Sequence, residues 1–177
     1  KKKYNLPKRY LFAFGSQAPR KNIKRLVEAF IKLNKEFSDL RLVITGRYNP
    51  EFELPKKIIT PGFLDREELL LIFDQAQALI YPSTYEGFGI PILEAFQLGV
   101  PVVTSNCSSM AEIAADAAVL VVPESVENIK KGIKQLLNDN EKQEKLIKNG
   151  NKRLKDFNWQ KTAEQTLQVY KKLIKRK

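Results

Sequence analysis

Apolar and polar positions alternate in two different ways along this chain. Short runs of branched or aromatic residues are separated by longer segments in which apolar residues return at helical spacing. This alternation is typical of a parallel sheet whose strands are joined by crossover helices. The short runs predict strands over residues 10–14, 40–45, 58–60, 78–81, 100–104 and 118–122.

The helical segments form two groups. Four of them connect strands, and right-handed crossovers of this kind build a Rossmann-like parallel sheet. After Pro123 the pattern contains helices alone, with no linker before them. We therefore expect one α/β domain over residues 1–177, a Rossmann-like parallel sheet flanked by helices with a helical C-terminal segment. Helices are predicted over residues 23–37, 67–76, 92–98, 110–115, 126–137, 141–155 and 159–174, with Ser125 and Asn158 as caps of the helices that follow them.

The charge balance is strongly basic, with 31 Lys and Arg against 20 Asp and Glu, or +11. Such a surface attracts nucleic acid, anionic lipid or a phosphorylated small molecule. Much of the excess lies on the last predicted helices, where most lysines are expected to be solvated. We expect no nucleic-acid partner; binding on charge alone would appear as salt-sensitive affinity for DNA or RNA. Peripheral contact with an anionic membrane or a lipid-linked acceptor is compatible with the charge.

Cysteine and histidine usage limits the chemistry further. The single Cys107 cannot form an internal disulfide, and the chain has no histidine for a structural zinc site. No window approaches the roughly 20 apolar residues of a membrane span. We expect a cytoplasmic protein, with any membrane contact peripheral and at the inner face. The chain begins without methionine, which suggests a fragment or an excised domain.

Two loops are expected at the carboxyl ends of the strands, where open parallel sheets bind their ligands. One covers residues 15–22. The other covers residues 85–94, where Gly87 and Gly89 allow close backbone approach and Pro91 suits a first helical turn. Both loops lead into helices, so both aim backbone amides and a helix dipole at one crevice, which is typical of an anion site.

Charged side chains in these loops point to a diphosphate. Arg20 can hold phosphate oxygens at two points and Lys21 supplies a compact charge. Since the chain has no Asp-x-Asp metal signature, we expect them to neutralise a diphosphate without a metal or another cofactor. Glu94 is placed to accept hydrogen bonds from a diol such as a ribose, whereas Glu86 precedes the glycines and can reach the group beyond the phosphates.

One run of residues carries a family resemblance. Tyr81-Pro82-Ser83 through Glu86-Gly87-Phe88-Gly89 to Glu94-Ala95 is similar to the Glu-x7-Glu motif of retaining glycosyltransferases. The chain resembles glycosyltransferase family 4, and would be the C-terminal nucleotide-sugar-binding half of its GT-B fold. The resemblance covers nearly the whole chain. Further matching segments are Pro19-Arg20-Lys21-Asn22, Gly99-Val100-Pro101-Val102-Val103-Thr104-Ser105, Asp116-Ala117-Ala118 and Phe157-Asn158-Trp159.

The resemblance implies a role for each candidate residue. Glu94 would hold the ribose hydroxyls and Glu86 the hydroxyls of the donor sugar, while Arg20 and Lys21 would stabilise the departing diphosphate. Glu86, Arg20 and Lys21 are therefore the implied catalytic residues. The other implied donor-site residues are Gly15, Ser16, Gly87 and Pro91 in the two loops, Phe88, Gly89 and Ile90 through their amides, Leu64 through its backbone beside the base, and Arg47 at the same rim.

Two positions depart from the family pattern. Many relatives have a second Arg where this chain has Ser16, and a Gly where it has Ala115. Ser16 can donate a hydrogen bond but carries no charge. The diphosphate would therefore depend more heavily on Arg20 and Lys21.

The implied activity is transfer of a hexosyl group from a nucleotide-diphosphate sugar to an acceptor, with retention, in surface polysaccharide or glycolipid synthesis. Negative charge would build on the leaving diphosphate, where fixed donors stabilise the transition state. GT-B enzymes need a second, N-terminal domain that carries most of the acceptor site, and this domain is absent from the sequence. We expect the chain alone to bind nucleotide but to transfer little or no sugar.

A binding module and an oxidoreductase are two alternative functions for a sheet of this kind. A non-catalytic nucleotide- or nucleotide-sugar-binding module would bind unchanged after replacement of Glu86. A nucleotide-dependent oxidoreductase is disfavoured, because no Gly-x-Gly-x-x-Gly follows the first strand and Gly46-Arg47, rather than an acid, follows the second.

Some polar and aromatic residues have structural explanations. Ser109-x-x-Glu112 predicts a helix capping box, and Trp159 is expected to pack in the core against the sheet. Cys107 has no histidine to activate it, so a nucleophilic role is not expected.

Overall fold

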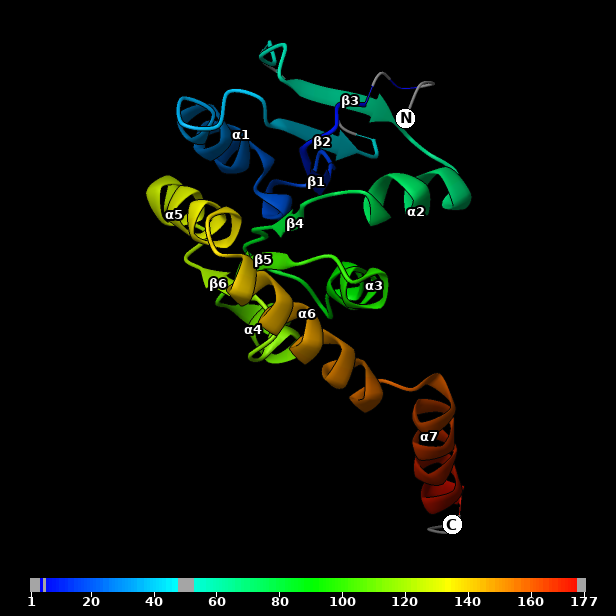
Figure 1. Cartoon of the computed structure of the whole chain (residues 1–177). Helices are drawn as coiled ribbons and strands as arrows, with labels where there is room; N and C mark the ends of the chain where they lie inside the picture. The colour runs from blue at the N-terminus through cyan, green and yellow to red at the C-terminus, as the bar shows by residue number, and fades with distance from the viewer. Residues whose placement is uncertain (1–3, 5, 48–52, 175–177) are drawn as a thin grey trace.

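A six-stranded parallel sheet forms the centre of the protein. The computed structural model describes residues 4, 6–47 and 53–174. The strand order is β3-β2-β1-β4-β5-β6, and every neighbouring pair is parallel (Figure 1). This arrangement confirms the predicted Rossmann-like class. The strands are β1 (Tyr10–Phe14), β2 (Arg41–Thr45), β3 (Ile58–Gly62), β4 (Ala78–Tyr81), β5 (Val102–Ser105) and β6 (Val119–Val121).

Helices connect the strands and continue alone after β6, as the sequence pattern predicts. A short 3-10 helix that was not predicted, η2 (Pro19–Lys21), lies between β1 and the first α-helix. The other helices are α1 (Ile23–Leu33), α2 (Arg66–Asp74), α3 (Ile90–Leu98), α4 (Ser108–Ala114), α5 (Val126–Leu137), α6 (Asn140–Arg153), the 3-10 helix η3 (Leu154–Asp156) and α7 (Trp159–Ile174).

The sheet separates two hydrophobic cores, because successive side chains of a strand point to opposite faces. On β1, Leu11 and Ala13 pack into the core that contains α1 and α5. Tyr10 and Phe12 face the opposite core, which contains α2, α3 and α4. Burial on both faces explains why the strands read as nearly continuous apolar runs.

Local capping explains two boundaries that differ from the prediction. Helix α1 ends at Leu33, because the side-chain amide of Asn34 donates to two carbonyl groups further along the chain and closes a turn. Helix α3 starts at Ile90, two residues early, since Gly89 caps it with φ +110° and Pro91 fits its first turn. The first feature depends on side-chain hydrogen bonds and the second on backbone conformation, and hydrophobic spacing contains neither.

The ends of β1 and β2 meet in a close backbone contact. The amide of Gly15 donates to the carbonyl of Thr45, and the amide of Gly46 donates to the carbonyl of Gly62 at 2.8 Å. Gly46 has φ +108°, and a Cβ there would lie 2.6 Å from the carbonyl oxygen of Gly15. Glycine is therefore required at residue 46 by both φ and space.

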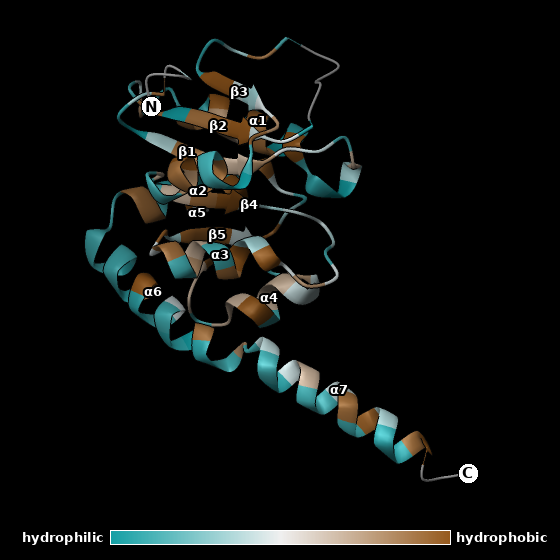
Figure 2. Ribbon diagram, turned by 90° about the vertical axis from the view of Figure 1, so that its right-hand side faces the viewer, coloured by the Kyte–Doolittle hydropathy of each residue, from teal (hydrophilic) through white to brown (hydrophobic). Residues whose placement is uncertain are grey.

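The helical C-terminal segment is confirmed, and so are its two predicted caps. Ser125 Oγ accepts from the amide of Asn128, and Asn158 Oδ1 accepts from the amide of Gln160. The prediction for Trp159 is wrong. Its side chain is 82% exposed, because α7 extends away from the sheet (Figure 2) and none of its residues is buried. Within the described ranges, no helix combines the length and apolar character needed to cross a membrane.

Candidate anion-binding site

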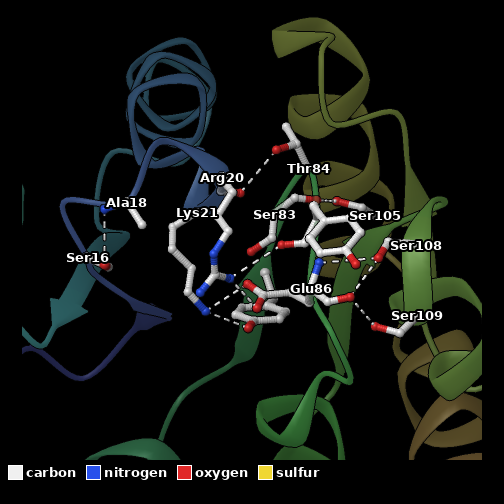
Figure 3. Close-up of polar contacts among 12 residues, drawn as sticks. Ser16, Ala18, Arg20, Lys21, Ser83, Thr84, Glu86, Ser105, Ser108 and Ser109 are labelled. Carbon is white, nitrogen blue, oxygen red and sulfur yellow. Dashed lines mark hydrogen bonds and ion pairs between the residues drawn. The ribbon is translucent and has the colours of Figure 1, made fainter.

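The two predicted loops flank the point where the strand order reverses. β1 and β4 are neighbours in the sheet, and the chain leads outward from them in opposite directions. In open α/β sheets, ligands bind in the crevice at such a switch point. The loops also contact each other, because the amide of Thr84 donates to the carbonyl of Arg20 at 2.8 Å. Figure 3 shows the side chains of Arg20 and Lys21 directed at Glu86 across this junction.

Glu86 is the buried anion of the site, with only 8% of its surface exposed. Arg20 Nη1 forms an ion pair with its Oε2, and Lys21 Nζ lies 2.8 Å from its Oε1. Burial raises the pKa of the Glu86 carboxyl, but polar contacts with Lys21, Ser83 and Tyr81 outweigh burial and hold that pKa below its ordinary value. The carboxylate is therefore charged at neutral pH and shared between two cations.

Lys21 is held by an aromatic side chain as well as by the carboxylate. Its Nζ donates to the phenol oxygen of Tyr81 at 2.7 Å and lies 4.8 Å from the centre of the same ring. Burial, followed by the hydrogen bond and the negative charge of Glu86, raises the pKa of the Tyr81 phenol. Tyr81 is therefore neutral, and its hydroxyl can accept from Lys21.

The backbone of Glu86 is fixed by two serines at the start of α4. Ser108 Oγ and Ser109 Oγ donate to the Glu86 carbonyl at 2.7 and 2.9 Å. The predicted capping box of Ser109 and Glu112 is wrong, because α4 starts two residues earlier than predicted and its N-cap, Cys107, makes no side-chain cap bond. The serine pair was missed as a site feature, although its place after a buried strand is a usable signal.

Asn22 joins three segments of the chain and was also missed. It is 4% exposed, and its Nδ2 donates to the carbonyls of Pro82 at 2.9 Å and Pro123 at 2.7 Å. Its backbone has φ +59°, a left-handed conformation that asparagine tolerates better than most residues. Asn22 thus connects the loop after β1 to the loops after β4 and β6.

The glycine loop leads into the N-terminus of α3 as expected. Gly89 has φ +110° and caps the helix without a side-chain bond. Pro91 has no amide proton and the Ile92 amide donates to the Gly89 carbonyl at 2.9 Å, so Ile90 supplies the first-turn amide that is left for another partner. Phe88 and Ile90 are 46% and 52% exposed. A Cβ at Gly87, in contrast, would meet nothing within 4 Å. The loop therefore presents both a free amide and exposed apolar side chains.

Glu94 lies one helical turn from the loop, at the edge of a cleft of about 580 Å³. Arg66 Nη1 donates to its Oε1 at 2.6 Å. The cleft also includes Phe88 and residues at the start of α7. Glu94 and Glu86 therefore have different cationic partners.

The remaining predicted residues lie around this centre. Gly15 takes part in the β1–β2 backbone contact, and Ser16 Oγ accepts from the amide of Ala18 at 3.2 Å, which closes the turn before η2 (Figure 3). The side chain of Leu64 is buried in the core, so only its backbone is available to a ligand, whereas Arg47 is exposed. Neither residue makes a described contact with Glu86.

Acidic residues do not gather into a metal site in the part of the chain that the structure describes. Among those residues, no group of three or more His, Cys, Asp or Glu side chains is placed to hold an ion. Metal independence remains a prediction. The groups in this region that could face an anion are Arg20, Lys21 and the backbone amides that lead into α3, up to that of Ile90.

A Rossmann-like sheet with paired cations and a helix N-terminus at its switch point is typical of domains that bind nucleotides or phosphates. Residues 1–153 match the family of glycosyl transferases group 1, and the chain therefore belongs to this family.

Curated relatives support this assignment. The chain is 34% identical over 176 residues to O-antigen chain mannosyltransferase B of Escherichia coli. This match covers 93% of the chain and 46% of that protein. It is 30% identical over 175 residues to the MMP alpha-(1->4)-mannosyltransferase of Mycolicibacterium hassiacum, covering 92% of the chain and 42% of that protein. The chain thus spans less than half the length of these relatives.

Solved structures show the same architecture. A sucrose-phosphate synthase of Thermosynechococcus elongatus superposes with a TM-score of 0.83 at 25% identity, over 99% of this chain and 48% of its own. The C-terminal domain of a glycosyl transferase group 1 protein, LpcC of Francisella tularensis, gives 0.76 at 25% identity, over 88% of this chain and 89% of its own. These likenesses confirm the predicted fold class, one Rossmann-like half of a GT-B fold.

Proposed function

We propose that this chain is the donor-binding half of a retaining, family 4 glycosyltransferase that takes a hexosyl group from a nucleotide-diphosphate sugar. The observation that carries the proposal is the placement of Arg20 and Lys21 against Glu86, beside the free N-terminus of α3. Two cations and a helix dipole at one point suit a diphosphate, and a buried carboxylate beside them suits sugar hydroxyls.

The proposed chemistry is electrostatic. As the bond between sugar and phosphate breaks, negative charge builds on the diphosphate, and donors fixed beforehand stabilise it more than they stabilise the bound substrate. Lys21, whose side chain is only 16% exposed, is held in place, whereas the 46% exposed side chain of Arg20 has room to move towards a ligand. Glu94 would accept hydrogen bonds from the ribose hydroxyls, with Arg66 orienting its carboxylate.

Mannose is the sugar that the relatives favour. Proteins named as mannosyltransferases occur among those that match most of the chain, including enzymes named for the O-antigen chain. We therefore propose a mannosyl donor and a surface polysaccharide or glycolipid as the product. A lipid-linked acceptor at the inner face of a membrane would agree with the basic charge of +11.

The acceptor site would come mostly from a second, N-terminal domain. The two curated mannosyltransferases named above are covered over less than half of their length, and α7 leaves apolar side chains such as Leu167, Tyr170 and Leu173 half exposed. A covering domain would bury them. The isolated chain should therefore bind nucleotide but transfer little or no sugar, since most of the acceptor site would lie in the second domain.

A non-catalytic nucleotide-binding module is the second candidate. Ser16 favours it, because this side chain closes its own turn and offers no charge to a diphosphate. The two candidates differ in one measurable respect. Replacement of Glu86 in the complete protein should abolish sugar transfer by an enzyme, whereas a binding module would retain its nucleotide affinity and show no transfer in the parent.

Thermal unfolding with UDP, GDP, ADP, dTDP and their sugar conjugates tests the site. A ligand at 100 times its dissociation constant adds about 2.7 kcal/mol, which raises the midpoint by a few degrees. Lys21→Ala and Glu94→Ala should lose this shift, while Lys131→Ala and Glu144→Ala, at exposed positions outside the site, should keep it. A parent chain that no nucleotide stabilises would contradict the proposal. The same assay with EDTA tests metal independence, which predicts an unchanged shift.

A further inference from the structure

Tyr81 has no role in the transfer chemistry proposed above, yet it touches the central cation of the site. It is the last residue of β4, 3% exposed, and its ring packs in the core with α2, α3 and α4. Its hydroxyl, at the opposite end of the ring, is the oxygen that lies 2.7 Å from Lys21 Nζ. A rigid aromatic ring therefore carries a polar atom from the core to the switch point.

The geometry around Lys21 shows why such an atom matters. An ammonium group has three protons on a flexible four-carbon stem, and fixing that stem costs rotamer entropy. Nζ donates a hydrogen bond to the Tyr81 oxygen at 2.7 Å, whereas Glu86 Oε1, 2.8 Å away, attracts it as an ion pair without hydrogen-bond geometry. The hydrogen bond fixes one proton of the ammonium, and the charge of Glu86 restricts rotation about that bond, so the directions of the remaining protons are limited.

We propose that Tyr81 is a positioning residue, whose phenol oxygen fixes the Lys21 ammonium so that a remaining proton is directed at a diphosphate oxygen of the donor. The inference rests on the proposed function, because it assumes that Lys21 binds the diphosphate. Tyr81 itself touches neither the reacting atoms nor the ligand. It acts through Lys21.

The chain offers a matched control in Tyr10. This tyrosine is also buried and packs in the same core, and its hydroxyl donates a hydrogen bond to the carbonyl of Ile72 at 2.7 Å. It is the first residue of β1, whereas Tyr81 is the last residue of the neighbouring parallel strand β4, so the two lie at opposite edges of the sheet. Tyr10→Phe and Tyr81→Phe each remove one buried hydroxyl and keep the ring. A difference between them in ligand binding therefore reports on the contact with Lys21.

The test is a double-mutant cycle on diphosphate affinity. Inorganic pyrophosphate and the nucleoside diphosphate that stabilises the parent are titrated into the parent chain, Tyr81→Phe, Tyr10→Phe, Lys21→Met and the Tyr81→Phe, Lys21→Met double variant. Tyr81→Phe should weaken binding about tenfold, the order expected for a hydrogen bond to a charged group, and Tyr10→Phe should not. With Met at residue 21, Tyr81→Phe should have no further effect. Full affinity in Tyr81→Phe, or an equal loss with and without Lys21, would overturn the inference.

A second measurement needs no ligand. In ¹⁵N spectra of lysine side chains, the Lys21 ammonium, assigned through its absence in Lys21→Met, should exchange its protons slowly in the parent and in Tyr10→Phe. Exchange should become fast in Tyr81→Phe, and slow exchange in that variant would overturn the inference. If the parent binds no diphosphate, the proposed function fails, and this spectrum alone still decides whether Tyr81 fixes Lys21. Unfolding midpoints of all variants show whether each remains folded.

Discussion

The loops around Glu86 and the terminal helix α7 differ in how far their side chains are buried and bonded within the chain. In the first region, Asn22, Tyr81 and Glu86 are buried and their polar groups are bonded across segments far apart in sequence. In α7 no residue is buried, and the side chain of Trp159 is 82% exposed. The contrast indicates that the chain assembles the candidate site from its own loops, whereas α7 has no cover among the described residues.

The strongest test of this contrast is the loss of a charge that the first region holds in place. In the complete protein, Lys21→Ala should lower the rate of sugar transfer about 100- to 1000-fold, as expected when one fixed donor to a developing charge is removed. The measurement is kcat with a mannosyl donor, and Lys131→Ala is the control. A loss below about fivefold would mean that Lys21 does not stabilise the leaving group.

Removing the side chain that joins three loops should cost the most stability. Asn22→Ala leaves the buried carbonyls of Pro82 and Pro123 without their donor and places alanine at φ +59°, so we expect unfolding to become easier by about 2–3 kcal/mol. Urea unfolding measures it. Asn149→Ala, which removes a surface hydrogen bond to Asp116, should cost less than about 1 kcal/mol and serves as the control.

The pH dependence of stability should reveal the buried carboxylate. The pKa of Glu86 in the folded chain lies below its ordinary value of 4.5, so its contribution is present above that pH and is lost as the pH falls through the folded-state pKa. Glu86→Gln should therefore be less stable than the parent at pH 7, and the gap should narrow towards pH 3. Unfolding curves at several pH values check this. If the difference in stability between the parent and Glu86→Gln stays constant across these pH values, the destabilisation does not come from the charge of Glu86.

The smallest effect is expected in α7. Leu173→Ser removes an apolar side chain that is 59% exposed, so the stability of this chain should change by less than about 0.5 kcal/mol. In the complete protein the same change should cost more, because a covering domain would bury the side chain. Equal, small effects in both proteins would show that α7 is uncovered in each, and the contrast between the two regions would then have another cause.

The sheet could be predicted closely because its signal is local. The bounds of β1 and β4 agree with the prediction to the residue, since each is a short buried run followed by loop residues. Helix ends were less predictable. The early end of α1 depends on hydrogen bonds of Asn34, which hydrophobic spacing does not contain.

The candidate site could be predicted only in part, for the same reason. Its loops follow from glycines, charges and spacing, but the partners of Glu86 come from β4, η2 and α4, and contacts over such distances leave no pattern in one sequence. Trp159 shows the opposite error. An aromatic residue in a helical pattern predicts burial, yet the pattern does not say which chain covers it.

Ala115 illustrates how a departure from a family pattern acquires a physical meaning. It ends α4 with φ +46°, a conformation that favours glycine, the residue that the family resemblance implies there. The chain therefore tolerates some backbone strain in the helix whose first residues hold Glu86.

Glycines in this chain differ in what a mutational library would report. At residue 46 any side chain would collide with the carbonyl of Gly15, so every substitution should be eliminated by a selection for folding alone. Gly87 has open space around it, and the fold accepts a side chain there. In a library screened separately for abundance and for activity, variants of residue 46 should therefore be eliminated in both screens. If variants of residue 87 are eliminated only in the activity screen, the requirement for glycine comes from the ligand. The result would then show that the ligand approaches the backbone at this residue.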